Sequence, residues 1–371
     1  MSAMWRPRIK FEHRPVKYDD GLVRIGGNTP GITRGLRDPD GSVWMLLALL
    51  DGSRTVGQIA DELVHRFPAR SPREVKKAVD RLNTAGHLED ASEVELSGSE
   101  RERYSRSRAF WRSVDRTPGR RGWDAQLRLR QARVVIVGVG GAGGAAARLL
   151  TMSGVGQLHC VDADVVELSN LNRQGLFTEQ DLGRPKVKAA LEQLRQHNSH
   201  VELTGSREHI VGPDQLRALA VTCDVLLMAA DQPSTGEIRS WTNQACHATG
   251  TAWVHSGYDG PRISIGIFRP GSGPCYDCAR AAEQHRRNVV SPRTAWAPGD
   301  SMTREHAATA SSASVAGDLA AHAVERLIIG TSGLAVNQEY GLNLATLGGY
   351  DTLRLEQPWP DCPTCRHEGH G

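Results

Sequence analysis

The sequence contains no long apolar run and no strong excess of charge of one sign. No stretch approaches the roughly 18 apolar residues that a membrane-spanning helix needs. Residues 1–11 lack the apolar segment that a secretory signal carries. Lys and Arg number 45 against 42 Asp and Glu, for a net charge of +3, which gives no strong field for nucleic acid or for a membrane. We therefore expect a cytoplasmic protein that binds neither.

Tandem repeats and low-complexity tracts are also absent from the 371 residues. The length suggests two domains, one of them large. A disulfide framework is not expected either, because the seven cysteines are odd in number and four of them form two distant Cys-x-x-Cys pairs. In a reducing compartment, such pairs favour a metal site over disulfides.

The two pairs lie about 84 residues apart. They are Cys275 with Cys278, and Cys362 with Cys365. Each pair offers two thiolates at the spacing of a tetrahedral site, and four sulfur ligands leave no open position, so we expect a structural Zn²⁺ site. The alternative is a redox dithiol, but that chemistry needs one pair at a helix start and not two matched pairs.

Residues 1–91 are expected to form a small α+β winged-helix domain. A strand is predicted at residues 22–25, helices begin after the N-caps Thr55 and Ser71, and residues 87–90 suggest a wing strand. A DNA-binding helix-turn-helix is the rival interpretation. The basic residues of the third helix are Arg73, Lys76, Lys77 and Arg81. They are mixed with acidic residues, so they are equally typical of a solvated helix face.

A nucleotide site is indicated further along the chain. An apolar strand at residues 133–137 leads into a glycine-rich turn, a helix, and a second strand that ends at Asp162. The glycines of the turn are Gly138, Gly140, Gly141 and Gly143. They let the backbone approach a phosphate at a helix N-terminus, and an acid about 20 residues on suits a ribose hydroxyl. This pattern predicts an α/β fold, a Rossmann-like, mostly parallel sheet with helices on both faces.

Three further motifs follow the second strand: Asp-Ala-Asp at 162–164, Ser-Asn-Leu-Asn-Arg-Gln at 169–174 and Gly-Arg-Pro-Lys at 183–186. A third apolar strand, at 225–228, leads to Asp231. In this order and spacing, the motifs resemble those of the ThiF/MoeB/HesA family, the bacterial relatives of ubiquitin-activating enzymes. The resemblance runs from about residue 103 to residue 365.

The resemblance implies an ATP-dependent adenylyltransferase and assigns roles to individual residues. Asp162 would bind the ribose with help from Asp164, and Asp231 would hold Mg²⁺. The expected triphosphate contacts are Asn170, Arg173 and Lys186, with Gln174 beside them in the same motif. Taken singly, each residue has another explanation. Arg173 would form a surface salt bridge, Lys186 would be a solvated residue of a helix, and Asp231 would cap the turn that follows it.

The charges suit the chemistry that the resemblance implies. A carboxylate that attacks an α-phosphate brings anions together, and Arg173, Lys186 and Mg²⁺ would neutralise that charge. The nucleophile is already ionised, so the reaction needs no general base. Positioning and electrostatics are the expected source of catalysis.

Residues 92–125 are expected to be a connector with one helix near residues 104–111. Its Arg-Tyr-Ser-Arg segment, 103–106, resembles a family segment whose second arginine reaches the ATP of the partner subunit. The resemblance implies a homodimer in which Arg106 acts as an arginine finger in trans. The adenylation domain with its zinc site is expected at residues 126–371.

The motifs leave more than one class of substrate open. Relatives that form thioesters or transfer sulfur use a cysteine in the loop that corresponds to residues 286–306, and this sequence has none there. Cys160, Cys223 and Cys246 are expected in the core. The layout is thus closest to the peptide-adenylating MccB type, with an N-terminal domain similar to PqqD-like domains that bind a leader peptide as an added strand.

We therefore expect adenylation of a carboxylate on a ribosomally made precursor peptide, which is bound through its leader. One alternative is a non-catalytic adaptor that delivers a leader peptide to a partner cyclodehydratase. The other is an enzyme that activates a ubiquitin-like sulfur carrier protein.

Overall fold

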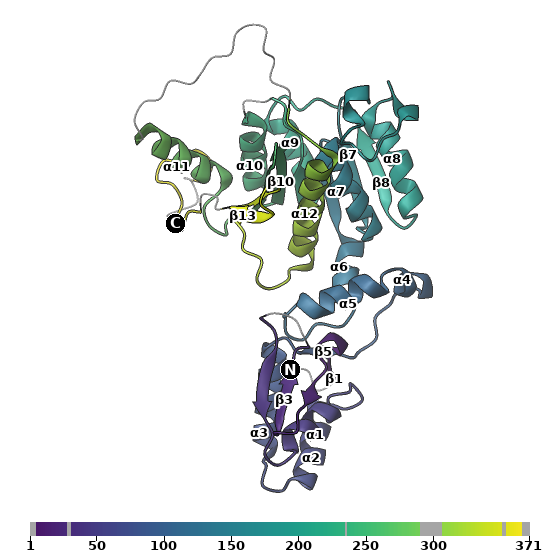
Figure 1. Ribbon diagram of the computed structural model, residues 1–371, viewed down its shortest axis with the longest axis vertical. Helices are drawn as coiled ribbons and strands as arrows, with labels where there is room; N and C mark the ends of the chain where they lie inside the picture. Colours follow the sequence, from purple (N-terminus) through teal and green to yellow (C-terminus); the bar gives the residue numbers. More distant parts are fainter. Residues whose placement is uncertain (1–4, 28–30, 234–235, 290–305, 351–353, 366–371) are drawn as a thin grey trace. The chain divides into compact units, whose positions relative to one another are not determined.

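The structure is a computed structural model that describes residues 5–27, 31–233, 236–289, 306–350 and 354–365 (Figure 1). Contacts divide the chain into two compact units. The first unit comprises Met1–Arg128 with Ile329–Gly333, and the second comprises Leu129–Ile328 with Leu334–Gly371. Among the described residues, no helix is long and apolar enough to cross a membrane.

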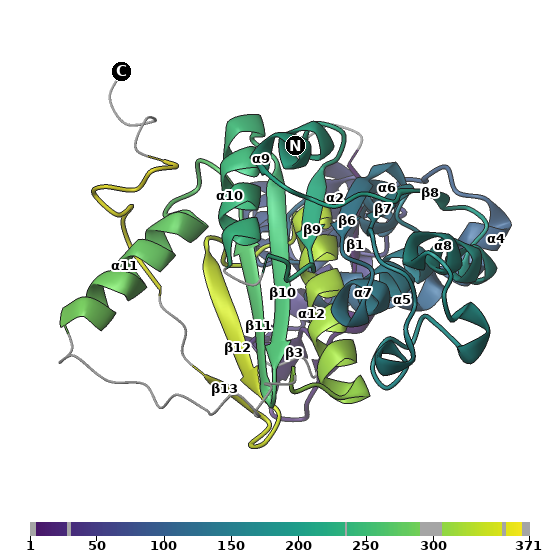
Figure 2. The ribbon, with the colours of Figure 1, turned by 90° about the horizontal axis from the view of Figure 1, so that it is seen from above.

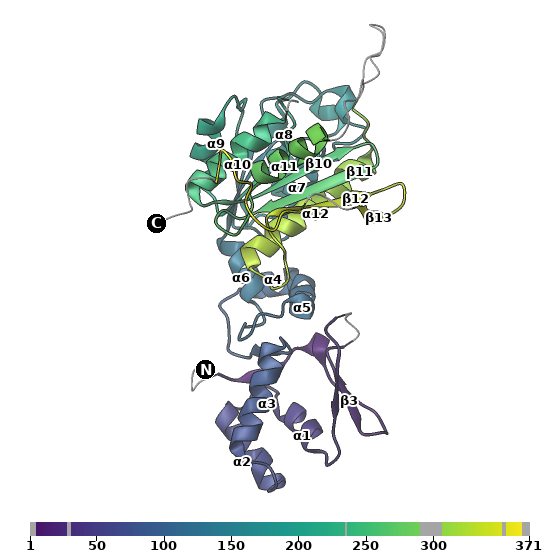
Figure 3. The same ribbon diagram turned by 90° about the vertical axis from the view of Figure 1, so that its left-hand side faces the viewer.

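The second unit is built on one eight-stranded sheet in the order β13-β12-β11-β10-β9-β6-β7-β8. Its strands are β6 (Arg133–Val137), β7 (Gln157–Val161), β8 (Glu202–Ser206), β9 (Val225–Met228), β10 (Ala252–Asp259), β11 (Arg262–Phe268), β12 (Gln338–Asn343) and β13 (Gly348–Tyr350). The strands from β8 to β10 pair in parallel, and β11, β12 and β13 extend the sheet in antiparallel fashion. Figure 3 shows this antiparallel part beside β10. The predicted Rossmann-like fold is confirmed.

Helices cover both faces of this sheet, as a parallel sheet requires. They are α7 (Gly141–Met152), α8 (Lys186–His197), α9 (Pro213–Ala220), α10 (Glu237–Thr249) and α12 (Ala310–Ile329), and α11 (Tyr276–Val289) contacts α10. Figure 2 shows α10 on one side of the strands and α7 and α12 on the other. The short 3₁₀ helices η2 (Leu168–Asn170) and η3 (Glu179–Asp181) lie between β7 and α8.

The sheet reverses its strand order beside β6. The chain runs outward from β6 through β7 to β8, then returns to place β9 on the other side of β6. Ligands of open α/β sheets bind outside the carboxyl ends of the strands at such a switch point. The glycine turn and Asp231 follow the two strands that flank this point, β6 and β9.

The first unit contains two small antiparallel sheets. One has the order β2 (Val16–Lys17), β3 (Leu22–Ile25) and β4 (Arg34–Arg37). In the other, β1 (Pro7–Ile9) pairs with β5 (Leu88–Asp90). The strand predicted at 22–25 is confirmed, and the strand expected at 87–90 is β5, which pairs with the N-terminal strand.

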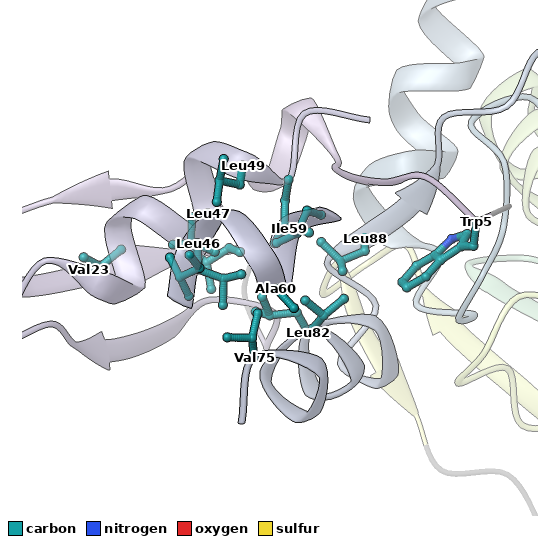
Figure 4. Packing of buried hydrophobic residues seen from close by; sticks show 14 residues of the cluster. Trp5, Val23, Leu46, Leu47, Leu49, Ile59, Ala60, Val75, Leu82 and Leu88 are labelled. Atoms are coloured by element: carbon teal, nitrogen blue, oxygen red, sulfur yellow. The ribbon is translucent and has the colours of Figure 1, made fainter. Parts of the chain in front are cut away.

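Three helices complete this core: α1 (Ser42–Leu49), α2 (Val56–Arg66) and α3 (Pro72–Thr84). Thr55 and Ser71 form the expected N-caps, each in a capping box. Figure 4 shows the side chains that these helices bury together with Leu88 of β5. The apolar spacing of α2 and α3 therefore faces a single core, as in other amphipathic helices.

The connector holds more helix than the sequence suggested. It contains α4 (Gly98–Arg103), α5 (Ser105–Val114) and the start of α6 (Asp124–Gln131). The prediction of a single helix near 104–111 captured only α5. The missed signal is Ser97 with Glu100, which form a third capping box at the start of α4.

Two histidines and a lysine are buried in the first unit. The Nδ1 atoms of His13 and His87 lie 3.3 Å apart. The ammonium group of Lys10, near the short helix η1 (Phe11–His13), donates to the carbonyl of Asp115. Burial lowers the pKa of His87 to about 4, and the pKa of Lys10 to about 8. His87 is therefore neutral in the folded state near pH 7.

We predict that the first unit loses stability as the pH falls from 6.5 toward 4. Over this range the unfolded chain protonates His87 and the folded chain does not, which costs up to about 3 kcal/mol. Urea unfolding, followed by hydrogen exchange in α2 and α3, should show the loss. His87→Gln should reduce the pH dependence, the remainder coming from His13, whose pKa burial also lowers, and His65→Gln, a change of an exposed histidine on α2, should leave it unchanged. Equal slopes for the two variants would contradict the prediction.

Candidate active site

The glycine turn brings backbone segments closer than side chains would allow. Gly138 has a φ of +87°, and a Cβ there would lie 2.7 Å from the amide nitrogen of Ala230. A Cβ on Gly143 would overlap the carbonyl oxygen of Gly138. The chain can therefore turn from β6 directly into α7, whose first amides then face the carboxyl ends of β6 and β9.

The carboxylate of Asp162 holds this turn to the end of β7. It accepts hydrogen bonds from the amides of Val139 (2.8 Å) and Asp164 (2.9 Å). Each oxygen accepts one of these bonds and keeps a further lone pair. Asp162 thus orders the phosphate-binding turn and retains capacity for a hydroxyl ligand.

Lys186 begins α8 and pairs with Asp164. Its Nζ lies 2.9 Å from a carboxylate oxygen of Asp164, and its amide donates to the carbonyl of Asp164. The lysine side chain is only 8% exposed, whereas that of Asp164 is 60% exposed. The ammonium group is therefore held at a fixed place, while its carboxylate partner is open to solvent.

Asn170, Arg173 and Gln174 come from the turn that includes η2. Asn170 accepts a bond from the amide of Glu167, which fixes the turn. Arg173 donates to the carbonyl of Ser169, but its buried Nε has no hydrogen-bond partner among the described residues. The buried Oε1 of Gln174 is likewise unsatisfied by the described residues. A buried polar atom without a hydrogen-bond partner destabilises the fold, so these two atoms suit a site where a polar ligand supplies the missing bonds.

A cavity of about 1000 Å³ opens at the carboxyl ends of the central strands. Among its lining residues are all of the predicted nucleotide-site residues except Gly143: Gly138, Gly140, Gly141, Asp162, Asp164, Asn170, Arg173, Gln174, Lys186 and Asp231. Asp231 is exposed at the rim, three residues after β9. Gly143 lies just behind, against Gly138.

Sequence reasoning missed further residues that line this cavity, among them Arg207, Arg239, Tyr258 and His306. Arg239 lies against the backbone of β10. Its guanidinium is so close to Gly257 that a Cβ added there would come within 2.6 Å of it. The rings of Tyr258 and His306 stack with centroids 5.2 Å apart. A usable signal existed, since Arg207 directly follows β8 and Tyr258 is the penultimate residue of β10.

The phenol of Tyr258 is partly buried where it lines the cavity. Burial raises the pKa of its phenol above the usual value, and the nearby charge of Arg173 opposes that shift. The phenol therefore stays protonated near pH 7 and can donate a hydrogen bond. Its oxygen lies close to the start of α7, where a Cβ on Gly141 would come within 2.5 Å of it.

The four cysteines of the two Cys-x-x-Cys pairs come together in the second unit. All four sulfur atoms lie within 4.8 Å of one another. Asn243 donates to the sulfur of Cys275, and the amide of Trp359 donates to the sulfur of Cys278. Burial raises the pKa of Cys365 to about 12, so the thiol ionises near pH 7 only if a cation compensates. Four sulfurs at this separation fit a tetrahedral zinc ion, and the group could bind one.

The other three cysteines are core residues, as expected. Cys160 and Cys246 are fully buried and Cys223 is nearly so. Burial raises the pKa of Cys160 and of Cys223 to about 12. These thiols are therefore poor nucleophiles near pH 7. The loop at residues 286–306 contains no cysteine in the sequence. Its residues 290–305 lie outside the described part of the chain.

Arg106 belongs to the first unit, where it is exposed on α5. Its predicted contact with a partner's ATP stays a prediction. The predicted division at residues 91 and 125 also stays a prediction.

Family comparison matches the ThiF family over residues 104–364. The molybdopterin-synthase adenylyltransferase of Escherichia coli K12 is 35% identical over 186 residues, which cover 50% of this chain and 70% of that protein. The sulfur carrier protein ThiS adenylyltransferase of the same strain is 35% identical over 158 residues, 42% of this chain and 61% of that protein. The chain belongs to the ThiF family and is an adenylyltransferase of the ThiF type, which implies the use of ATP.

Solved structures extend the likeness of fold to nearly the whole chain. E. coli MccB is 20% identical and superposes with a TM-score of 0.74 over 98% of each chain. Other MccB structures contain ATP, or AMPCPP together with MccA. At this identity the match establishes the fold alone, and it includes both units.

We predict that Gly143→Ala abolishes ATP binding measured by titration calorimetry. The new methyl group would overlap the carbonyl of Gly138, so the turn must move away from α7. Gly175→Ala is the matched control, because nothing lies within 4 Å of a Cβ there. Wild-type affinity in the Gly143 variant would contradict the role given to the turn.

The four-cysteine group leads to a second prediction about this unit. Purified protein should contain one zinc ion per chain, and Cys362→Ser should remove it and lower the melting temperature, since structural zinc contributes folding energy. Cys223→Ala changes a buried cysteine outside the cluster and should keep the zinc. A zinc-free wild-type protein with full stability would exclude this assignment.

Proposed function

We propose that this enzyme adenylates a carboxylate on a ribosomally made precursor peptide, releasing pyrophosphate, in natural-product peptide modification. The proposal rests on the cavity at the switch point, where a glycine turn, unsatisfied polar atoms and positive side chains lie together. The likeness of the whole chain to the fold of MccB supports it. In the reaction, a carboxylate oxygen attacks the α-phosphorus of ATP. The bond to the β-phosphate breaks and pyrophosphate leaves.

Four positive side chains would stabilise this transfer: Arg173, Lys186, Arg207 and Arg239. They line the same cavity as the glycine turn. Charge that builds on the α-phosphate oxygens and on the leaving pyrophosphate is best stabilised by groups already fixed in place. Lys186 meets this condition, because it is buried and tied to Asp164 at both its amide and its ammonium group.

The remaining roles follow from the chemistry of each side chain. We propose that Asp162 binds the ribose, with Asp164 beside it, and that Asn170, Arg173 and Gln174 bind the phosphates. Asp231 offers the hard carboxylate oxygen that Mg²⁺ prefers. The ion would neutralise the charge of the triphosphate.

A peptide substrate is favoured by the first unit. The match to the molybdopterin-synthase adenylyltransferase covers half of this chain, whereas the likeness to MccB includes the first unit. No cysteine occurs between Cys278 and Cys362 to accept a protein thioester. Activation of a sulfur carrier is the second candidate, because the names of the sequence relatives point to it.

We also propose that the first unit binds the leader of the precursor. β2 and β4 are the outer strands of its three-stranded sheet, so each leaves one backbone edge that an extended peptide can join. The enzyme would act as a homodimer in which Arg106 reaches the partner's ATP. A partner cyclodehydratase would be needed only if the chain also serves as an adaptor.

Exchange of labelled pyrophosphate into ATP tests this function. With Mg²⁺, a synthetic precursor peptide carrying a free C-terminal carboxylate should support exchange, and the same peptide with a C-terminal amide should not if the reacting acid is terminal. A sulfur carrier protein ending in Gly-Gly should be inert. Exchange with the carrier and with no peptide would reject the peptide assignment in favour of the second candidate.

The same assay tests the site. Lys186→Ala should lower the exchange rate by about 10²–10³-fold, as for other fixed groups that stabilise charge in a transition state. Lys188→Ala is the matched control, since Lys188 is exposed two residues further along α8. Equal rates for the two variants would show that the phosphate contacts are assigned wrongly.

A further inference from the structure

A second groove lies wholly within the first unit. It has a volume of about 610 Å³ and is formed by β1, η1, α1 and α5. Its apolar lining is Ile9, Phe11, Pro15, Trp44, Leu47, Ala48 and Leu50, and its charged lining is Arg8, Lys10, Arg14, Asp51, Arg108 and Arg112. We call this site the α1–α5 groove.

Large apolar side chains stand exposed at this groove. Phe11 is 66% exposed and Trp44 is 38% exposed. Val16, in β2, and Tyr18, directly after β2, follow the groove along the chain and are 50% and 41% exposed. Clustered exposed apolar residues mark interaction sites, whereas single ones are common on any surface.

The groove also carries an excess of positive charge. Buried Glu89 accepts a hydrogen bond from Arg8 and forms an ion pair with Arg112, and Glu12 forms a second ion pair with Arg112, so two carboxylates offset the charges of these two arginines. Arg14 instead lies over the ring of Phe11, and Arg108 lies over the ring of Trp123 and donates to the carbonyl of Gly122. Among the described residues, neither of these two arginines forms a salt bridge, so both guanidinium groups remain available to a ligand, with Glu89 and Glu12 also acting on the charge of Arg108.

The position of the groove relates it to a sheet edge. Pro15 lines the groove and directly precedes β2, an outer strand of the three-stranded sheet. A peptide that extended the sheet at β2 would therefore be carried toward Arg14 and Phe11. Such a peptide would present alternate side chains to the groove.

From these features, we propose that the α1–α5 groove binds an acidic segment of the precursor peptide in which carboxylates alternate with bulky apolar side chains. The apolar side chains enter between Trp44 and Phe11, and the carboxylates pair with Arg14 and Arg108. The proposal rests on the proposed function for the existence of a peptide substrate. It adds the chemistry of the segment that the first unit reads.

Fluorescence anisotropy with the full chain tests this proposal. The probe is the fluorescein-labelled peptide Asp-Leu-Glu-Phe-Asp-Leu-Glu-Phe. Two comparison peptides replace its acids by Lys, or its Leu and Phe by Ser. The acidic–apolar probe should bind at least about tenfold more tightly than either, because charge pairing and burial of apolar surface both contribute.

Variants locate the binding. Arg14→Glu and Trp44→Ala should each weaken the probe by about tenfold or more. Lys77→Glu makes the same change of charge on an exposed face of α3, and Phe110→Ala removes an exposed ring outside the groove lining. Both controls should bind the probe like the wild type. Circular dichroism and sedimentation on the same samples report folding and oligomeric state.

Three results would overturn the proposal: equal binding of all three peptides, equal binding by groove and control variants, or groove variants that change the oligomeric state and leave probe binding intact. The last result would make the groove an interface between copies of this chain. Pyrophosphate exchange separates the two proposals. At saturating precursor peptide, a groove variant should reach the same rate of pyrophosphate exchange as the wild type. If the proposed function is wrong, the wild type itself should show no peptide-dependent exchange.

Discussion

The site depends on one close approach of backbone to backbone, where the glycine turn after β6 meets the end of β9. Gly138 lies against the amide of Ala230, and Gly143 lies against Gly138. No side chain can stand between them, so the first amides of α7 and the carboxyl ends of the parallel strands border one cavity. Each later feature of the site is arranged around the anion-binding corner that results.

Charge is distributed around this corner in a pattern that suits a triphosphate and a carboxylate. Lys186 is buried and held by Asp164, whereas the carboxylates of Asp164 and Asp231 lie toward solvent. Fixed cations need no reorganisation when the phosphates become more negative. The four-cysteine group lies in the same unit, where it brings the start of α11 together with the C-terminal segment, although Cys278 and Cys362 are 84 positions apart.

The sequence predicted the parts that depend on local spacing. The strand at 133–137, the N-caps Thr55 and Ser71 and the four-cysteine group all follow from short motifs, and the fold follows from the order of the motifs. Residues that long-range packing alone brings to the cavity were missed. Arg239 reaches it because Gly257 on another strand leaves room, and His306 reaches it by stacking on Tyr258. No local pattern carries that information. The α1–α5 groove was missed for the same reason, since its walls come from segments about 100 residues apart.

The central claim is that an acid oxygen attacks the α-phosphorus of ATP. The direct measurement uses ¹⁸O in the carboxylate of whichever acid supports pyrophosphate exchange. After turnover in unlabelled water, mass spectrometry follows the label. The account predicts AMP that carries one ¹⁸O atom, because the bond broken in the second step joins the acyl carbon to the transferred oxygen. Label that appears in inorganic phosphate, accompanied by ADP, would contradict it, because the acid would then have been activated at the γ-phosphate.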